Sequence, residues 1–196
     1  MLEVQTEAKY DQICCSLPGT VRQDGVRGIA PANPNMRNDK LRGVFEKLGF
    51  ANVKTVISSG NVIFESPSRS AATLEETIEK ALPEHLGFTS TTILRSQVQI
   101  KRLVDQNPFK GMEHSQTSSL NVTFLKKKRK VDLKFPYNVN NRDDSLLGMY
   151  NGAICSVIDL TSAKTPDLMV WLEKQFGKEI TTRTWKTVGR ILKAME

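Results

Sequence analysis

The stretch MRNDKLRGVFEKLGFANVKTVISSGNVIF, residues 36–64, decides how the first half of the chain folds. Its first part places apolar residues at positions i, i+3, i+4 and i+7, which is the spacing of one helix face. These residues are Leu41, Val44, Phe45 and Leu48. Asn38 is placed to cap the start of this helix, and Gly49 suits the left-handed position after its end. The second part predicts a hairpin, because residues 53–57 and 62–64 have strand character and enclose the turn sequence SSGN.

The residues that follow extend this half into a helix, a strand and a further helix. Thr73 and Glu76 have the spacing of a capping box, and an apolar stripe comes after them. The stripe consists of Leu74, Ile78, Ala81 and Leu82. A strand is predicted over residues 91–94, and the capping box Ser96-x-x-Gln99 opens the next helix. With one strand ahead of residue 30, the order is strand–helix–strand–strand–helix–strand, which predicts an α+β fold with a ferredoxin-like first half.

The second half predicts a smaller α/β subdomain with a C-terminal helix. We expect strands at residues 120–125 and 131–135, the latter at a sheet edge because apolar and charged residues alternate there. An Asn-Gly turn predicts a hairpin of residues 146–150 and 153–160. A helix opened by a Thr-Pro pair and the final helix follow. The predicted organisation is a divergent segment over 1–25, a ferredoxin-like subdomain over 26–108 and a second α+β subdomain over 109–196.

The composition excludes several classes of protein. Hydrophobic residues make up 39% and charged residues 25% of the chain, as in ordinary globular proteins. Apolar runs are short and the first residues include acids, so we expect no membrane span, no signal peptide and a cytoplasmic protein. The three cysteines form a poor disulfide framework, and the two histidines have no ligand spacing with them, so neither a metal nor a cofactor is predicted.

The net charge of +7 lies entirely in the second half of the chain. Residues 99–196 carry 17 basic and 10 acidic side chains, whereas residues 1–98 carry 11 of each. This asymmetry indicates either an anionic partner for the second half or a solvated basic face.

The stretch TTRTWKTVGR, residues 181–190, is the principal candidate site. A helix N-terminus offers free N–H groups and the positive end of a dipole, and hydroxyl groups with two cations would complete a socket for phosphate or carboxylate. We expect it to meet the SSGN turn and the Asn/Pro-rich loop before the first helix in a cleft between the two halves. The predicted ligand-binding residues are Arg27, Asn33, Asn35, Ser58, Ser59, Asn61, Thr181, Thr182, Arg183 and Lys186. The structural alternative is that Trp185 belongs to the core and the hydroxyl residues form caps and turns.

A run of five basic residues is a second candidate. It consists of Lys126, Lys127, Lys128, Arg129 and Lys130. The run is either a solvated hairpin tip or a sequence-neutral contact with nucleic-acid phosphates.

Catalytic motifs are absent from the sequence, which contains no G-x-S-x-G, Walker A, GxGxxG or HExxH pattern. The leading hypothesis is a binding module for a phosphorylated small molecule or a nucleic-acid backbone. The alternatives are an enzyme acting on a phosphate-containing substrate and a structural or oligomerising protein.

Three stretches together resemble a known bacterial family. They are VRGI at residues 26–29, followed by an Asn/Pro-rich loop and Met36, then TVISSGNVIF at residues 55–64 and TTRTWKTV at residues 181–188. They are similar to segments of the family called domain of unknown function 1697. The resemblance implies an α+β fold with a ferredoxin-like half, and it implies no activity.

The chain departs from this family pattern at its start. The family has an apolar strand where residues 22–26 read RQDGV. Either residues 13–17 supply the first strand through a longer loop, or the first strand is compromised.

Overall fold

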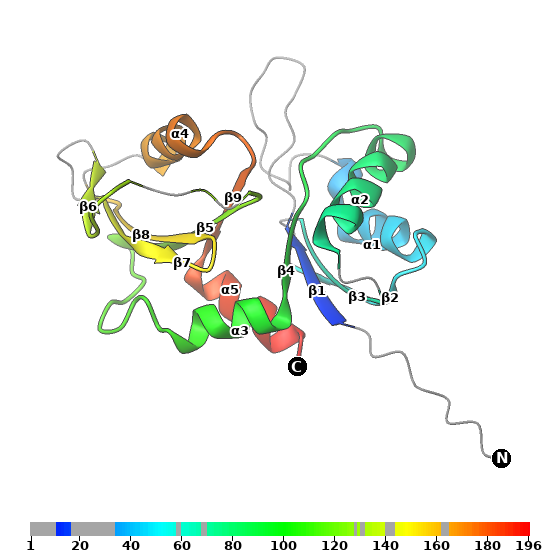
Figure 1. Cartoon of the computed structure of the whole chain (residues 1–196), viewed down its shortest axis with the longest axis horizontal. Coiled ribbons are helices and arrows are strands. Elements are labelled where there is room, and N and C mark those ends of the chain that lie inside the picture. Colours follow the sequence, from blue (N-terminus) through cyan, green and yellow to red (C-terminus); the bar gives the residue numbers. More distant parts are fainter. Residues whose placement is uncertain are drawn as a thin grey trace.

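The first half of the chain forms the predicted ferredoxin-like unit. The computed structural model describes residues 11–16, 34–57, 60–67, 70–127, 129, 132–139, 144–161 and 165–196. The elements of this half are β1 (Asp11–Ser16), the 3-10 helix η2 (Pro34–Met36), α1 (Asn38–Lys47), β2 (Ala51–Val56), β3 (Asn61–Ser66), α2 (Ala71–Leu86), β4 (Ile93–Ser96) and α3 (Gln97–Asp105). The strands form one antiparallel sheet in the order β2-β3-β1-β4. Helices α1 and α2 cover one face of it (Figure 1), so the α+β fold with a ferredoxin-like half is confirmed.

Strand β1 settles which residues supply the first strand. It pairs antiparallel with β3 on one side and with β4 on the other, so it is an inner strand of the sheet. Residues 11–16 therefore provide this strand, ahead of the family-like segment that begins at residue 26.

The helix caps were only partly predicted. The N-cap of α1 is Arg37 without a side-chain cap bond, and Asn38 is already helical, so the predicted Asn38 cap is wrong. The N-cap of α2 is Ser70, whose hydroxyl accepts a bond from the Thr73 N–H, so the helix starts one turn before the predicted capping box. The capping box at Ser96 is confirmed, with both reciprocal bonds to Gln99 formed.

The second half builds a five-stranded antiparallel sheet in the order β6-β7-β8-β5-β9. Its elements are β5 (Ser118–Leu125), β6 (Tyr137–Asn138), β7 (Ser145–Tyr150), β8 (Ala153–Asp159), α4 (Thr165–Phe176), β9 (Ile180–Thr184) and α5 (Trp185–Ala194). The predicted hairpin is confirmed, with positive φ at both turn residues, 49° at Asn151 and 80° at Gly152. The predicted strand at 131–135 is wrong over the described residues 132–135: Leu133 and Phe135 pack against the core beneath α4 without joining the sheet, and the pairing with β7 falls to β6.

The buried apolar side chains of the described residues form three cores. The first lies between α1, α2 and the first sheet, where the rings of Phe45 and Phe64 meet edge to face at 5.3 Å. The third lies between the second sheet and α4. The central core contains side chains of both sheets and of α3 and α5, among them Ile63, Val122 and Val188. One core thus crosses the boundary predicted near residue 108, and the division into subdomains stays a prediction.

Across the described residues, the longest apolar helical stretches are too short or too charged to cross a membrane.

Candidate functional site

The stretch TTRTWKTVGR is a strand followed by a helix. Its first residues complete β9, which pairs with β5, and α5 begins at Trp185. The Thr184 hydroxyl caps the helix by accepting a bond from the Thr187 N–H at 3.3 Å, and the two threonine hydroxyls share a bond of 2.9 Å. Trp185 packs on Phe109 with ring centroids 5.1 Å apart. Trp185 is therefore packed against the central core, and one of the orphan N–H groups of this helix already has a partner.

Arg183 joins the two sheets. Its Nε donates to Oδ1 of Asn61 at 2.7 Å, and Asn61, at the start of β3, is 1% exposed. Its Nη1 donates at 2.8 Å to the hydroxyl of Thr181 and at 2.8 Å to the carbonyl of Thr182. On the other face of β9 the Thr182 hydroxyl bonds that of Thr123 on β5. Side chains that are 122 residues apart in the chain therefore meet here, with the guanidinium bonded to protein acceptors.

The other predicted ligand-binding residues do not join this cluster in the described part of the chain. Asn35 accepts a bond from Lys40 and lines a separate groove between α1 and the end of α2. Lys186 is exposed on α5. Arg27, Asn33, Ser58, Ser59, Lys128 and Lys130 lie outside the described residues. The ligand-binding role of the set stays a prediction.

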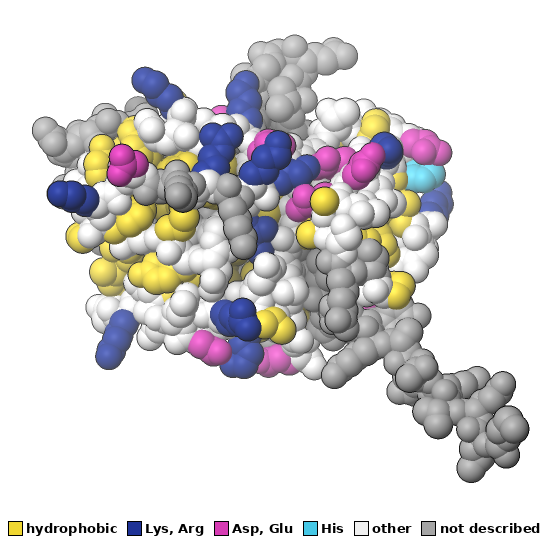
Figure 2. Space-filling view, in the orientation of Figure 1, with side chains coloured by type: hydrophobic (Ala, Val, Ile, Leu, Met, Phe, Trp, Pro, Cys, Tyr) yellow, Lys and Arg dark blue, Asp and Glu magenta, His cyan; other side chains and the backbone are white. Residues whose placement is uncertain are grey.

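A hollow of about 460 Å³ lies between the two halves, bounded by α2, β4, the end of β5 and the β7–β8 turn. We call it the inter-sheet hollow. Its charged lining residues are Glu75, Glu76, Glu79, Arg95, Lys126 and Lys127. Figure 2 shows Lys and Arg side chains beside Asp and Glu side chains across the upper middle of this face. Two residues of the predicted basic run, Lys126 and Lys127, thus line a site between the halves.

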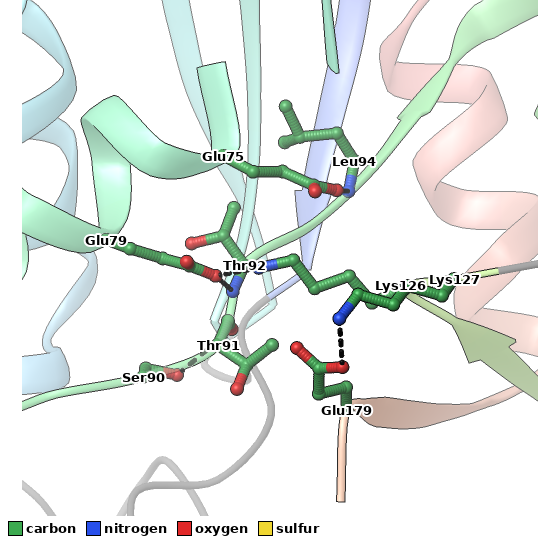
Figure 3. A network of polar contacts seen from close by, with 9 residues as sticks. All are labelled: Glu75, Glu79, Ser90, Thr91, Thr92, Leu94, Lys126, Lys127 and Glu179. Carbon is green, nitrogen blue, oxygen red and sulfur yellow. Dashed lines mark hydrogen bonds and ion pairs between the residues drawn. The ribbon is translucent and has the colours of Figure 1, made fainter. Parts of the chain in front are cut away.

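Two carboxylates of α2 cover the outer edge of β4 at this hollow. Oε1 of Glu79 accepts the Thr92 N–H at 2.6 Å, and Oε1 of Glu75 accepts the Leu94 N–H at 3.1 Å (Figure 3). Residues four apart on a helix share a face, and residues two apart on a strand present their N–H groups to the same side, so the two spacings match. The carboxylates take the place of a neighbouring strand at an otherwise open sheet edge.

Burial raises the pKa of the Glu75 carboxyl above its ordinary value, and the Leu94 N–H and the charge of Lys126 oppose this shift. Glu75 is 8% exposed, and it lies seven residues before the buried Leu82 on the same helix face. The position of Glu75 at the border of the apolar stripe of α2 was the sequence signal that could have identified this buried carboxylate.

Arg95 of β4 crosses the hollow to the second sheet. Its Nη1 donates to the Leu94 carbonyl at 2.6 Å, and its Nη2 donates to the carbonyls of Leu125 at 2.6 Å and Gly152 at 3.3 Å. The guanidinium lies 5.5 Å from the ring centroid of Phe124. Nothing in the sequence pointed to this role, because the two carbonyl partners lie 30 and 57 residues further along the chain, one in β5 and one in the β7–β8 turn.

Two lysines that follow β5 pair with glutamates of different segments, one on α2 and one just before β9. Nζ of Lys126 lies 2.5 Å from Oε1 of Glu79, and these side chains are only 14% and 30% exposed. Nζ of Lys127 lies 3.4 Å from Oε2 of Glu179, with side chains 71% and 41% exposed (Figure 3). The first pair is largely shielded from solvent, whereas the second is open to screening by salt.

Metal-ligating side chains and the thiol of Cys155 are further candidates for chemistry. No group of three or more His, Cys, Asp or Glu side chains there is placed to hold a metal ion. Burial raises the pKa of the Cys155 thiol to about 12, which suppresses the thiolate.

The ferredoxin-like sheet, the second sheet and the hollow between them define a two-sheet α+β protein with a mixed-charge hollow between the sheets. Residues 26–143 match the family described as "Protein of unknown function (DUF1697)", and the chain belongs to this family. The chain is similar in structure to the conserved bacterial protein SP0830 from Streptococcus pneumoniae, with a TM-score of 0.67 and 21% identity over 96% of this chain and 100% of that chain. That similarity shows a shared fold. No curated protein matches the chain.

Proposed function

We propose that this protein is a binding module whose inter-sheet hollow holds a small molecule carrying an anionic group. The observation that carries the proposal is the convergence of Arg95, Lys126 and Lys127 on one hollow between the halves. A volume of about 460 Å³ lies in the range of sites for small ligands, which is about 300–1,000 Å³.

The start of α2 adds to the positive potential of this hollow. Ala71 and Ala72 of its first turn line the hollow, and that turn contains no acidic residue. Small side chains leave the backbone N–H groups approachable, and the helix dipole places partial positive charge there. The positive end of a 16-residue helix and the cations of the second half therefore act on the same space.

The three carboxylates of the lining each have a partner within the protein. Glu75 and Glu79 accept N–H groups of the β4 edge, and Glu79 also bonds Lys126. Glu76 bonds Lys80 at 2.6 Å on the exposed side of α2. Lys127, whose side chain is 71% exposed, is the cation best placed to meet an entering anion.

The test is a thermal-shift and calorimetric screen of nucleotides, phosphosugars and inorganic pyrophosphate at low salt. A ligand present at about one hundred times its dissociation constant stabilises the fold by about 2.7 kcal/mol. We expect Lys127→Glu to weaken binding at least about tenfold, which corresponds to about 1.4 kcal/mol. The matched control is Lys193→Glu on the exposed side of α5, which makes the same charge change away from the hollow.

Two results would count against the proposal. One is the absence of any shift across the panel. The other is equal weakening by Lys127→Glu and Lys193→Glu, which would show that net charge and not the hollow attracts the anion. An oligonucleotide that binds with a salt dependence growing with its length would move the site to the basic surface.

A further inference from the structure

We infer that Glu79 is an intramolecular competitor of the anionic ligand for Lys126, and that this contact sets the affinity of the inter-sheet hollow. The inference rests on the proposed function of the hollow and concerns its regulation. Glu79 belongs to α2 in the first half of the chain, and Lys126 follows β5 in the second (Figure 3). Their pair closes across the space that a ligand would enter.

A single oxygen of Glu79 holds both contacts. Oε1 accepts the Thr92 N–H at 2.6 Å and lies 2.5 Å from Nζ of Lys126. The side chain of Lys126 is 14% exposed, so its ammonium group is weakly hydrated, and Glu79 is the carboxylate that pairs with it. A ligand anion that reaches Lys126 meets the Glu79 carboxylate at the same ammonium group, and the two negative charges repel each other.

Among the charged groups near Glu79, Lys126 is the cation that bonds its carboxylate. Glu75, one turn earlier on α2, is a second negative charge on that side. On the β4 side Arg95 donates to carbonyls, and beyond Lys126 the exposed Lys127 pairs with Glu179. Neutralising Glu79 would therefore remove the carboxylate that bonds Lys126 and would leave Glu75 as the nearby carboxyl group that interacts with its charge.

Glutamine separates the charge of Glu79 from its structural role. In a Glu79→Gln variant the side-chain oxygen still accepts the Thr92 N–H, so the edge of β4 stays covered. Only the competition for Lys126 is removed. The matched control is Glu179→Gln, which removes a carboxylate from Lys127, but from a pair that is exposed and 3.4 Å long.

The experiment is isothermal titration of the full chain with inorganic pyrophosphate at low salt. We expect Glu79→Gln to bind about tenfold more tightly than the wild type and Glu179→Gln to stay within about twofold of it. In a Lys126→Gln background the gain from Glu79→Gln should disappear, because the contested ammonium is gone. Far-UV circular dichroism of each variant confirms that the fold is retained.

The outcomes separate this inference from the proposed function. If the wild type and Glu79→Gln bind pyrophosphate equally, or the variant binds more weakly, the competition does not exist and the hollow remains a binding site. If neither binds at millimolar concentration, both proposals are overturned. Binding that appears only in Glu79→Gln supports the competition. A gain that persists in the Lys126→Gln background overturns it, because the gain would then arise from a change in overall charge.

Discussion

Replacement of Arg183 tests whether the stretch TTRTWKTVGR, residues 181–190, holds the two sheets together. The guanidinium of Arg183 on β9 bonds Oδ1 of Asn61 on β3 and the hydroxyl of Thr181. Asn61 is 1% exposed and Thr181 is 3% exposed, so both acceptors are shielded from water. In an Arg183→Ala variant these oxygens lose a charged donor and water cannot readily replace it.

The expected effect follows from these contacts. A hydrogen bond from a charged donor contributes about 1.5–3 kcal/mol, and a buried acceptor left without its donor costs about 1–3 kcal/mol. Arg183 itself is half-buried, so we take the lower end of each range. Arg183→Ala should then lower the free energy of unfolding by about 2.5 kcal/mol, with a coupling energy of about 1.5 kcal/mol between Arg183 and Asn61 in a double-mutant cycle.

The assay is urea unfolding followed by far-UV circular dichroism for the wild type, Arg183→Ala, Asn61→Ala and the double variant. Arg190→Ala, on the exposed side of α5, is the matched control and should change stability by less than about 0.5 kcal/mol. A coupling energy indistinguishable from zero would refute the reasoning, since the Arg183–Asn61 bond would then contribute nothing to the union of the sheets.

Three further predictions concern single groups. Burial raises the pKa of Glu75, so the stability linked to its neutral form is present below its ordinary pKa of 4.5 and is lost as pH rises through the raised value. The Glu75→Gln variant should therefore melt at a higher temperature than the wild type at about pH 8, and this difference in melting temperature should be gone by about pH 4. A difference that does not depend on pH would contradict this prediction. Gly152→Ala should lower the free energy of unfolding by about 1–2 kcal/mol, because φ is 80° at that residue. Gly189→Ala on α5, which has open space around it, should raise the free energy of unfolding by about 0.5–1 kcal/mol. Equal effects of the two substitutions in urea unfolding would exclude backbone strain at Gly152. Cys155, with a thiol pKa of about 12, should escape alkylation by iodoacetamide in the native protein and react in urea, as read by peptide mass spectrometry; labelling of the native protein would show that the strand opens.

Local patterns predicted most of the elements, because the information needed lies within a few residues. The apolar spacing of α1, the Ser96 capping box and the Asn-Gly turn each depend on neighbours in the chain. The ferredoxin-like order then followed from the sequence of elements. The failures have the same origin: residues 132–135 alternate like a strand but pack under α4, and no local pattern shows which partner a segment will find.

The candidate site was predicted less well, because its contacts join distant segments. The convergence of Asn61 and Arg183 was expected, and the structure brings them together. Glu79 and Arg95 were not expected, since their partners lie 47 and 57 residues away. Residue type identified the polar side chains that are candidates for a site. It could not distinguish a side chain that binds a ligand from one that already bonds another strand of the protein.

The distribution of charge joins the two halves of the chain at the inter-sheet hollow. The second half carries the whole excess of +7, and at the hollow its Lys126 pairs with Glu79 of α2. The Lys126–Glu79 pair therefore satisfies part of the positive charge internally, while Lys127 stays exposed beside the hollow. A ligand that binds there is selected by the placement of its negative charge relative to these pairs. Total charge alone would favour any polyanion, whereas a site with its own carboxylates rejects anions that cannot displace or avoid them.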